Sequence, residues 1–148
     1  MLKVLVVTWG LEDPTPILQT AAWLSKELDA ELHVAYVWSV LPRGALEFVD
    51  STHYGTQEGD ARQALEAQVR TVEAAGGIVA RIYLKPGVPE RVAAKLGNEV
   101  GADLVIVGSR RLGFVKRLLL GGEAERIVRR AHFSVLVVRQ ELPGIPES

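Results

Sequence analysis

The chain has no cysteine among its 148 residues. Without thiols it cannot hold a disulfide framework, a thiolate zinc site or a cysteine nucleophile. Long apolar runs are missing too, since Val4–Val7 and Val135–Val138 are far shorter than the roughly 20 residues that a membrane-spanning helix needs. No basic and then apolar leader precedes the first strand-like stretch. We therefore expect a cytoplasmic protein that makes no use of a membrane.

A strong net charge is also absent, because the formal charge at pH 7 is −1. The chain has no overall field that would collect nucleic acid, so no nucleic-acid partner is predicted. Basic residues gather locally near the C-terminus, at Arg110, Arg111, Lys116, Arg117, Arg126, Arg129 and Arg130. The last three are typical of a solvated helix face, whereas the first four lie in a glycine-marked loop that could bind an anion.

Three motifs of nucleotide-binding and hydrolytic enzymes are not found. No G-x-x-x-x-G-K-[ST] follows a strand, and no G-x-G-x-x-G follows the first one. No G-x-S-x-G elbow occurs either. The three histidines are scattered without partner carboxylates, so we assign them structural roles and predict no metal site and no catalytic residue.

Strands and helices alternate along the chain. Five short stretches rich in β-branched or alternating apolar residues are typical of strands, namely Val4–Val7, Glu31–Trp38, Ile78–Leu84, Leu104–Val107 and Val135–Val138. Helical periodicity predicts four helices, which carry Ile17 to Leu28, Glu58–Ala75 (with Ala61, Leu65, Val69 and Val72 on one side), Val92 to Val100, and Glu123–Ala131. Trp23, on the first helix, is predicted to lie in the core or at an interface.

Breakers mark the ends of these elements. Asp13 or Thr15 can cap the first helix, Gly76-Gly77 closes the second, and Gly101 stops the third. The stretch Leu41–Gly59 has no clear period and is interpreted as a loop. Residues 1–140 then form a single α/β domain, and residues 141–148, with two prolines and a glycine, form a flexible tail.

Alternating strands and helices predict a five-stranded parallel sheet, doubly wound with helices on both faces. In such sheets, ligands bind beyond the carboxyl ends of the strands, where the strand order reverses. This rule points to the loops after the first and fourth strands, Thr8–Asp13 and Gly108–Gly122.

The second of these loops, GSRRLGFVKRLLLGGE from Gly108 to Glu123, carries the chemistry. Glycines let backbone amides approach an anion closely, and the N-terminus of the following helix favours negative charge. The alternative is a plain connection whose glycines serve only its turns. The spacing alone does not decide between the two.

The same segment resembles the C-terminal signature of the universal stress proteins, whose loop has the form G-x-x-G, nine residues, then G-[S/T/N]. The opening KVLVV and the GADLVIVGS before the loop match as well, so the resemblance extends to about Arg139. It implies a strand order of 3-2-1-4-5 and a homodimer formed by edge-to-edge pairing of the last strands, Val135, Leu136, Val137 and Val138. Some members of the family bind ATP, with Mg²⁺, and others do not.

Three positions depart from the pattern of ATP-binding members. Arg111 stands where a glycine is usual, and it either fills the space of a phosphate or contacts the phosphate. Gly122 replaces a hydroxyl or amide residue, and Trp9 stands after the first strand where relatives have an aspartate. Glu12 and Asp13 are shifted and are not taken as its substitute.

The resemblance places candidate nucleotide contacts on both loops and on the second strand. They are Thr8, Trp9, Val37, Val107, Gly108, Arg110, Arg111, Gly113, Gly121, Gly122 and Glu123. The first hypothesis is a non-enzymatic, homodimeric stress-response module with a degenerate adenine-nucleotide cleft. The alternatives are an ATP-binding protein with slow ATPase activity, and a carrier of another anion in the same cleft.

Overall fold

The computed structural model describes residues 1–10, 13–38, 51–108, 129 and 131–139. The elements in chain order are β1 (Lys3–Trp9), α1 (Thr15–Glu27), β2 (Glu31–Trp38), α3 (Ser51–Ala74), β3 (Val79–Pro86), α4 (Pro89–Val100), β4 (Leu104–Gly108) and β5 (Ser134–Val138). Each of the five predicted strands is therefore present, with ends that shift by two residues or fewer.

The five strands form one sheet in the order β3-β2-β1-β4-β5, as the resemblance implied. All the pairings are parallel, and β1 lies between β2 and β4 with Val4 opposite both Leu32 and Leu104. The direction of winding reverses at β1, because the chain moves from β1 to β2 and β3 on one side and places β4 and β5 on the other. The predicted fold class is confirmed.

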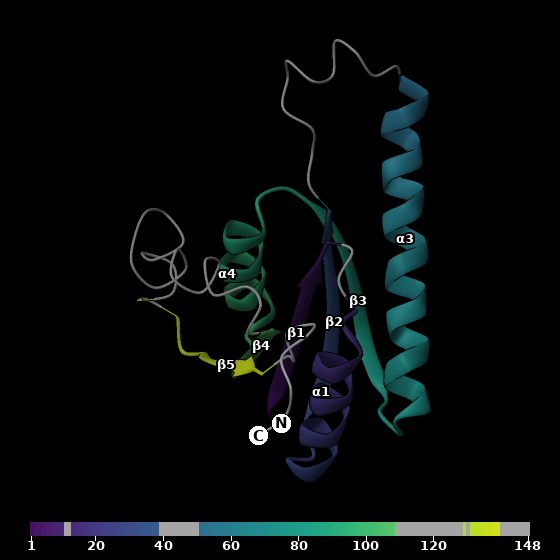
Figure 1. Cartoon of the computed structure of the whole chain (residues 1–148). Helices are drawn as coiled ribbons and strands as arrows, with labels where there is room; N and C mark the ends of the chain where they lie inside the picture. The colour runs from purple at the N-terminus through teal and green to yellow at the C-terminus, as the bar shows by residue number, and fades with distance from the viewer. Residues whose placement is uncertain (11–12, 39–50, 109–128, 130, 140–148) are drawn as a thin grey trace, which may run out of the picture.

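Side chains of β1 alternate between two cores. Val4 and Val6 pack with residues of α1 and α3, whereas Leu5 and Val7 pack with residues of α4. The central strands are buried on both faces, which explains their continuous apolar runs. In Figure 1, α1 and α3 lie on one side of the sheet and α4 lies on the other.

Glycines end two of the helices as predicted. Gly101 follows α4 with a φ of 69°, a left-handed conformation that costs glycine little. Gly76 follows α3 with a φ of 86°. At the start of α1, the N-cap position is Pro14, and Asp13 supplies the capping oxygen by accepting a hydrogen bond from the backbone amide of Thr15 at 3.0 Å.

The prediction of a loop over the whole of Leu41–Gly59 is wrong, because α3 begins at Ser51. Residues 51–57 precede the predicted start of the helix at Glu58. In Figure 1 this end of α3 extends beyond the carboxyl ends of the strands, so its first turns have no sheet to pack against. A helix segment without a packing surface shows no apolar period, and Gly55 within the segment also disfavours the helix prediction.

The predictions for Trp23 and for the last helix have different outcomes. Trp23 is 60% exposed, so its predicted place in the core is wrong for the single chain, and a role at an interface is not tested. Of the last predicted helix, Glu123–Ala131, the structure describes only Arg129, which is helical, and Ala131, which is not. Most of that helix and the predicted tail lie outside the described residues.

Candidate functional site

The carboxyl ends of β1 and β4 meet where the winding of the sheet reverses. β1 ends at Trp9 and β4 ends at Gly108, which is paired with Val138 of β5. On the α4 face of this region, Val107 and Val37 are buried in one core, and Trp9 packs against it half-buried. Three of the predicted contact residues thus share one face of the sheet near its carboxyl edge.

Thr8 lies on the opposite face from Trp9, because successive strand residues point to opposite sides of a sheet. Its side chain is buried towards α3 and its hydroxyl donates a hydrogen bond of 2.7 Å to Oε1 of Gln68. The side chains of Thr8 and Trp9, both predicted nucleotide contacts, therefore lie on opposite faces of the sheet. The remaining predicted contacts, Arg110, Arg111, Gly113, Gly121, Gly122 and Glu123, lie outside the described residues.

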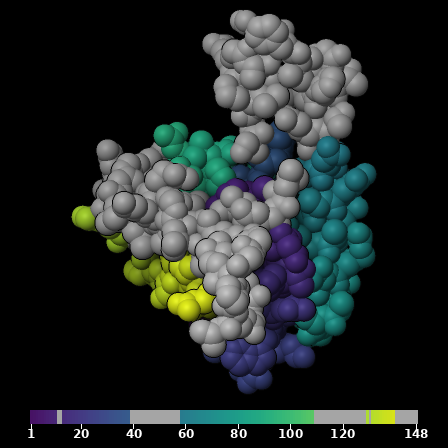
Figure 2. All heavy atoms as spheres, in the orientation of Figure 1, coloured from purple at the N-terminus to yellow at the C-terminus, as the bar shows by residue number. Residues whose placement is uncertain are grey.

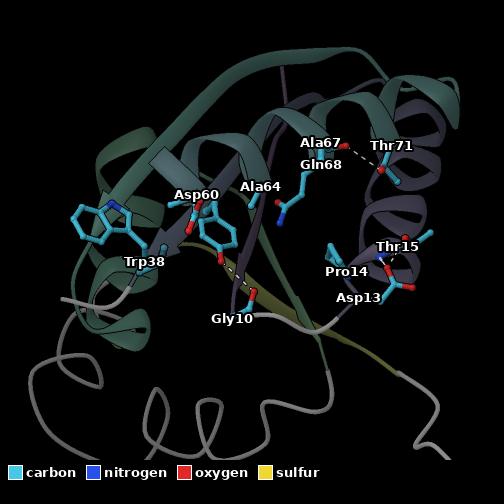
Figure 3. Close-up of a pocket in the computed structure, with 13 residues that line it drawn as sticks. Gly10, Asp13, Pro14, Thr15, Trp38, Asp60, Ala64, Ala67, Gln68 and Thr71 are labelled. Atoms are coloured by element: carbon cyan, nitrogen blue, oxygen red, sulfur yellow. Dashed lines mark hydrogen bonds between the residues drawn. The ribbon is translucent and has the colours of Figure 1, made fainter. Parts of the chain in front are cut away.

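A cleft of about 670 Å³ opens on the face that carries α1 and α3, and we call it the α1/α3 cleft. It lies at the carboxyl ends of β1 and β2, between the start of α1 and the middle of α3 (Figure 3). Its lining residues are Gly10, Asp13, Pro14, Thr15, Tyr36, Val37, Trp38, Asp60, Ala61, Ala64, Ala67, Gln68 and Thr71.

Two hydrogen bonds fix the rim of the α1/α3 cleft. The hydroxyl of Tyr36 donates to the carbonyl oxygen of Gly10 at 3.0 Å, which ties the turn after β1 to the end of β2. Gly10 adopts a φ of 80° there, a conformation that other residues rarely tolerate. The hydroxyl of Thr15 donates to Oδ1 of Asp13 at 2.6 Å and orients that carboxylate at the start of α1.

Gln68 is the polar group at the base of the α1/α3 cleft. It is 5% exposed, and its carboxamide points from α3 into the cleft in Figure 3. The 2.7 Å distance to the Thr8 hydroxyl is typical of an O–H···O bond and short for N–H···O, which supports Oε1 as the atom facing Thr8. Within the described ranges, Nε2 then has no acceptor. An unpaired buried amide costs roughly 1–3 kcal/mol.

Among the described residues that line the α1/α3 cleft, the charged side chains are those of Asp13 and Asp60. The hydrogen bond from the Thr15 hydroxyl, followed by that from its backbone amide, holds the pKa of Asp13 below its usual value. Asp13 therefore carries its charge throughout the physiological range.

Sequence reasoning missed this cleft, although one signal was present. The predicted apolar stripe of α3 contained Ala61, Leu65, Val69 and Val72. In the structure Val69 is only half-buried and Gln68 takes the buried position. A buried glutamine within an apolar stripe needs polar partners, and the Thr8 hydroxyl is the partner of its Oε1. The small residues Ala61 and Ala64, one turn earlier, leave the space in front of it.

The other conspicuous polar groups have structural explanations. His33 is 3% exposed, and its Nδ1 lies 2.9 Å from the Tyr83 hydroxyl and its Nε2 lies 3.2 Å from Oε1 of Glu31. This agrees with its predicted role as a packed strand residue. No group of three His, Cys, Asp or Glu side chains placed to hold a metal ion occurs in the part of the chain that the structure describes.

The predicted dimer segment, Val135–Val138, lies in the edge strand β5. Its four residues are half-buried in the single chain, and β5 reaches the surface on one side of the molecule, in yellow in Figure 2. β3 forms the other edge, where Ile82 is 54% exposed. Among the described helices, none is long and apolar enough to cross a bilayer.

Comparisons with known proteins agree with this fold. The model of the universal stress protein family matches residues 1–139. A universal stress protein of Methanocaldococcus jannaschii is 28% identical over 140 residues, which cover 93% of this chain and 82% of that protein.

Two solved structures share the fold. A universal stress protein in complex with cAMP is 24% identical, with a TM-score of 0.62 and coverage of 93% of this chain and 96% of that one. The universal stress protein from Archaeoglobus fulgidus in complex with dAMP is 16% identical, with a TM-score of 0.61 and coverage of 93% and 98%. With the family model matching nearly its whole length, this chain belongs to the universal stress protein family.

Proposed function

We propose that this protein is a homodimeric, non-catalytic regulatory module that binds an adenine nucleotide at the carboxyl ends of β1 and β4. The observation that carries the proposal is the reversal of winding at β1, because ligands of such sheets bind beyond the carboxyl ends of the strands at the point of reversal. Family membership supports it, as do the two structural neighbours that were solved with cAMP and dAMP.

The base of the nucleotide is proposed to lie against the apolar residues of the α4 face. Trp9, Val37 and Val107 form that surface, and the indole of Trp9 is large enough to stack on a purine. Thr8 is given no direct contact, because its hydroxyl is already bonded to Gln68 inside the other face.

The phosphate is proposed to bind the loop that starts at Gly108. Backbone amides at Gly108, Gly113, Gly121 and Gly122 would donate hydrogen bonds, and the start of the following helix at Glu123 would favour the negative charge. Arg110 and Arg111 would add charge-assisted contacts and so replace the missing hydroxyl at position 122. When ATP binds together with Mg²⁺, no residue of this chain is proposed to coordinate the metal ion.

The homodimer is proposed to form through β5. An edge strand exposes unpaired backbone groups, and pairing with a second copy satisfies them. Its half-buried apolar side chains would gain further cover in such a dimer.

Calorimetric titration of the nucleotide-free protein with AMP, cAMP and ATP–Mg²⁺ tests the nucleotide proposal. We expect dissociation constants in the micromolar range, on the order of −8 kcal/mol of binding free energy. Arg111→Gly should weaken AMP binding about tenfold while adenosine binding is unchanged, since only AMP carries the phosphate.

Phosphate release is measured in parallel with ATP–Mg²⁺. The proposal predicts no turnover above the rate without protein, and steady turnover would instead establish the alternative, a slow ATPase. Absence of heat at millimolar nucleotide, together with an unshifted Tm, would contradict binding altogether.

A further inference from the structure

We propose that the edge of the sheet at which the strands begin, the amino edge, is a second interface between copies of this chain. Seven large apolar side chains are exposed in the described part of the chain, and four of them lie on the segments that lead into β1, β2 and β3. A group of exposed apolar side chains on one side of a protein marks an interaction surface. We call this group the amino-edge cluster, and it consists of Met1, Leu2, Leu28 and Ile78.

The parallel pairing of the strands brings Leu2 and Ile78 close together. The backbone amide of Glu31, the first residue of β2, donates a hydrogen bond of 2.8 Å to the carbonyl oxygen of Leu2. On the other side of β2, Ile78 immediately precedes Val79, which pairs with Leu32. Leu2 and Ile78 therefore flank the start of β2, about two strand spacings or roughly 10 Å apart along the edge.

The ends of α1 and α3 lie at the same edge. A Cβ atom added at Gly77 would lie 3.0 Å from the Cβ of Ala22, so the turn after α3 packs directly against α1. Leu28 is the C-cap of α1, and Ile78 follows this turn, so the two side chains lie on neighbouring segments. In Figure 1 the C-terminal ends of α1 and α3 lie at the same end of the molecule as the N-terminus.

The charges beside the amino-edge cluster favour a second copy of the chain as its partner. Lys26, Glu27 and Asp29 are exposed at the end of α1, and none of them forms an ion pair with another described residue. A cation and two anions on one surface are complementary to the same surface of a second copy, because a two-fold axis places Lys26 of one copy opposite the acids of the other. A partner of one charge sign would be repelled by part of this surface.

The backbone of Asp29 adds to this argument. Among the described residues, Asp29 alone has a positive φ without being a glycine, at 50°. It follows the C-cap of α1, where glycine is the usual residue because it adopts the left-handed conformation with little strain. A carboxylate that pairs with Lys26 of a second copy offsets the strain that an aspartate brings to this position.

Light scattering over a range of concentrations tests the amino-edge interface on the full-length protein. The cluster is small, so we expect a dissociation constant on the order of 100 µM. The proposed β5 dimer should then persist at about 10 µM, where the β5 variants are measured, and approach the mass of a tetramer at about 1 mM. A mass that stays dimeric up to about 1 mM overturns the proposal.

Two isoleucines on the same side of the sheet give a matched pair of variants. Ile78→Glu places a charge within the cluster and should weaken the association at least about tenfold. Ile82→Glu is the control, since Ile82 is 54% exposed but lies in the middle of β3, and it should leave the association unchanged. Circular dichroism checks that both variants are folded. Equal effects of the two substitutions, or no effect of Ile78→Glu, would overturn the proposal.

Lys26→Glu tests whether the partner is a second copy. It makes the charges beside the cluster uniformly acidic, so two copies should repel each other at low salt and associate again at about 0.5 M salt, where the charges are screened. Unchanged association of Lys26→Glu at low salt, or a loss that salt does not restore, contradicts the pairing of two copies through this surface.

The tetramer rests on the proposed β5 dimer, whereas the amino-edge contact does not. If only the β5 dimer is wrong, the wild type is a monomer at about 10 µM, and Ile78→Glu still lowers the mass at about 1 mM. If only the amino-edge interface is wrong, the wild type is a dimer at both concentrations and Ile78→Glu changes nothing. The two failures are therefore distinguishable.

Discussion

The hydrogen bond between Thr8 and Gln68 joins β1 to α3 inside an otherwise apolar core. Thr8→Val removes its donor with almost no change in shape and leaves Oε1 of Gln68 buried without a partner. We expect Thr8→Val to lower the free energy of unfolding by about 1–2 kcal/mol. Adding Gln68→Met to Thr8→Val also removes the unpaired amide, so the double variant should regain at least the free energy of unfolding that Thr8→Val loses. Urea unfolding of the four proteins measures this cycle.

The cycle also asks why a polar pair stands where apolar residues would fit. If the polar pair adds no stability over an apolar one, the double variant is as stable as the wild type. Additive losses in the two single variants, with the double variant the least stable, would show instead that the amide stabilises the fold in another way.

Asp13 gives α1 a stability that depends on pH. Hydrogen bonds from the Thr15 hydroxyl and amide lower its pKa in the folded state, so its carboxylate stabilises the fold above the unfolded pKa. That contribution is lost as the pH falls through the lowered pKa. Asp13→Asn should be less stable than the wild type at pH 7, and the difference should shrink as the pH falls below the ordinary pKa of an aspartate, about 3.9, and through the lowered pKa of Asp13. A difference independent of pH, in urea titrations, contradicts this assignment.

At the scale of the element, one substitution has opposite effects at two glycines. Gly101 ends α4 in a left-handed conformation with a φ of 69° and open space around it, so Gly101→Ala strains only the backbone. We expect a loss of about 1 kcal/mol. Gly59 lies inside α3 with equally open space, so Gly59→Ala should stabilise the protein by about 0.5–1 kcal/mol. Thermal unfolding compares the two variants, and equal signs would contradict the account.

The ends of the elements were predictable where glycine or proline sets the backbone. Gly101 and Gly76 stop their helices as expected, because their positive φ values suit no other residue as well. The start of α3 at Ser51 was not predictable, because its first turns lie beyond the sheet and so lack an apolar period. Gln68 was missed for a different reason, since its partner Thr8 is 60 residues away in sequence.

At the scale of the whole molecule, the register of β5 decides which of its backbone amides bond to β4 and which face the open edge of the sheet. The amide of Ser134 donates to the Asp103 carbonyl at 2.9 Å, so by alternation the amide of Leu136 also faces β4. The amide of Val137 then faces the open edge. Val137→Pro should abolish the proposed homodimer while β4–β5 pairing survives.

Light scattering measures this effect on the oligomeric state. Leu136→Pro is the matched control, since it removes an inner bond and should lower the Tm whatever the oligomeric state. A folded Val137→Pro protein that remains dimeric would show that the dimer does not use the edge of β5.

The topology was the most predictable feature of the whole molecule. Alternating strands and helices gave a parallel sheet, and the family resemblance gave its order. The α1/α3 cleft was not predictable, because it depends on the packing distance between α1 and α3 above the ends of β1 and β2. The nucleotide contacts predicted for positions 110 to 123 lie outside the described residues, and they stay predictions.

The most direct test of the central claim is an NMR titration of the ¹⁵N-labelled protein with AMP, followed at every assigned amide. The account predicts that AMP shifts the amides of Trp9, Val107 and Gly108 at the carboxyl ends of β1 and β4, and leaves the side-chain amide of Gln68 unchanged. Shifts confined to Gln68 and its neighbours in the α1/α3 cleft, or no shifts at saturating AMP, would contradict it.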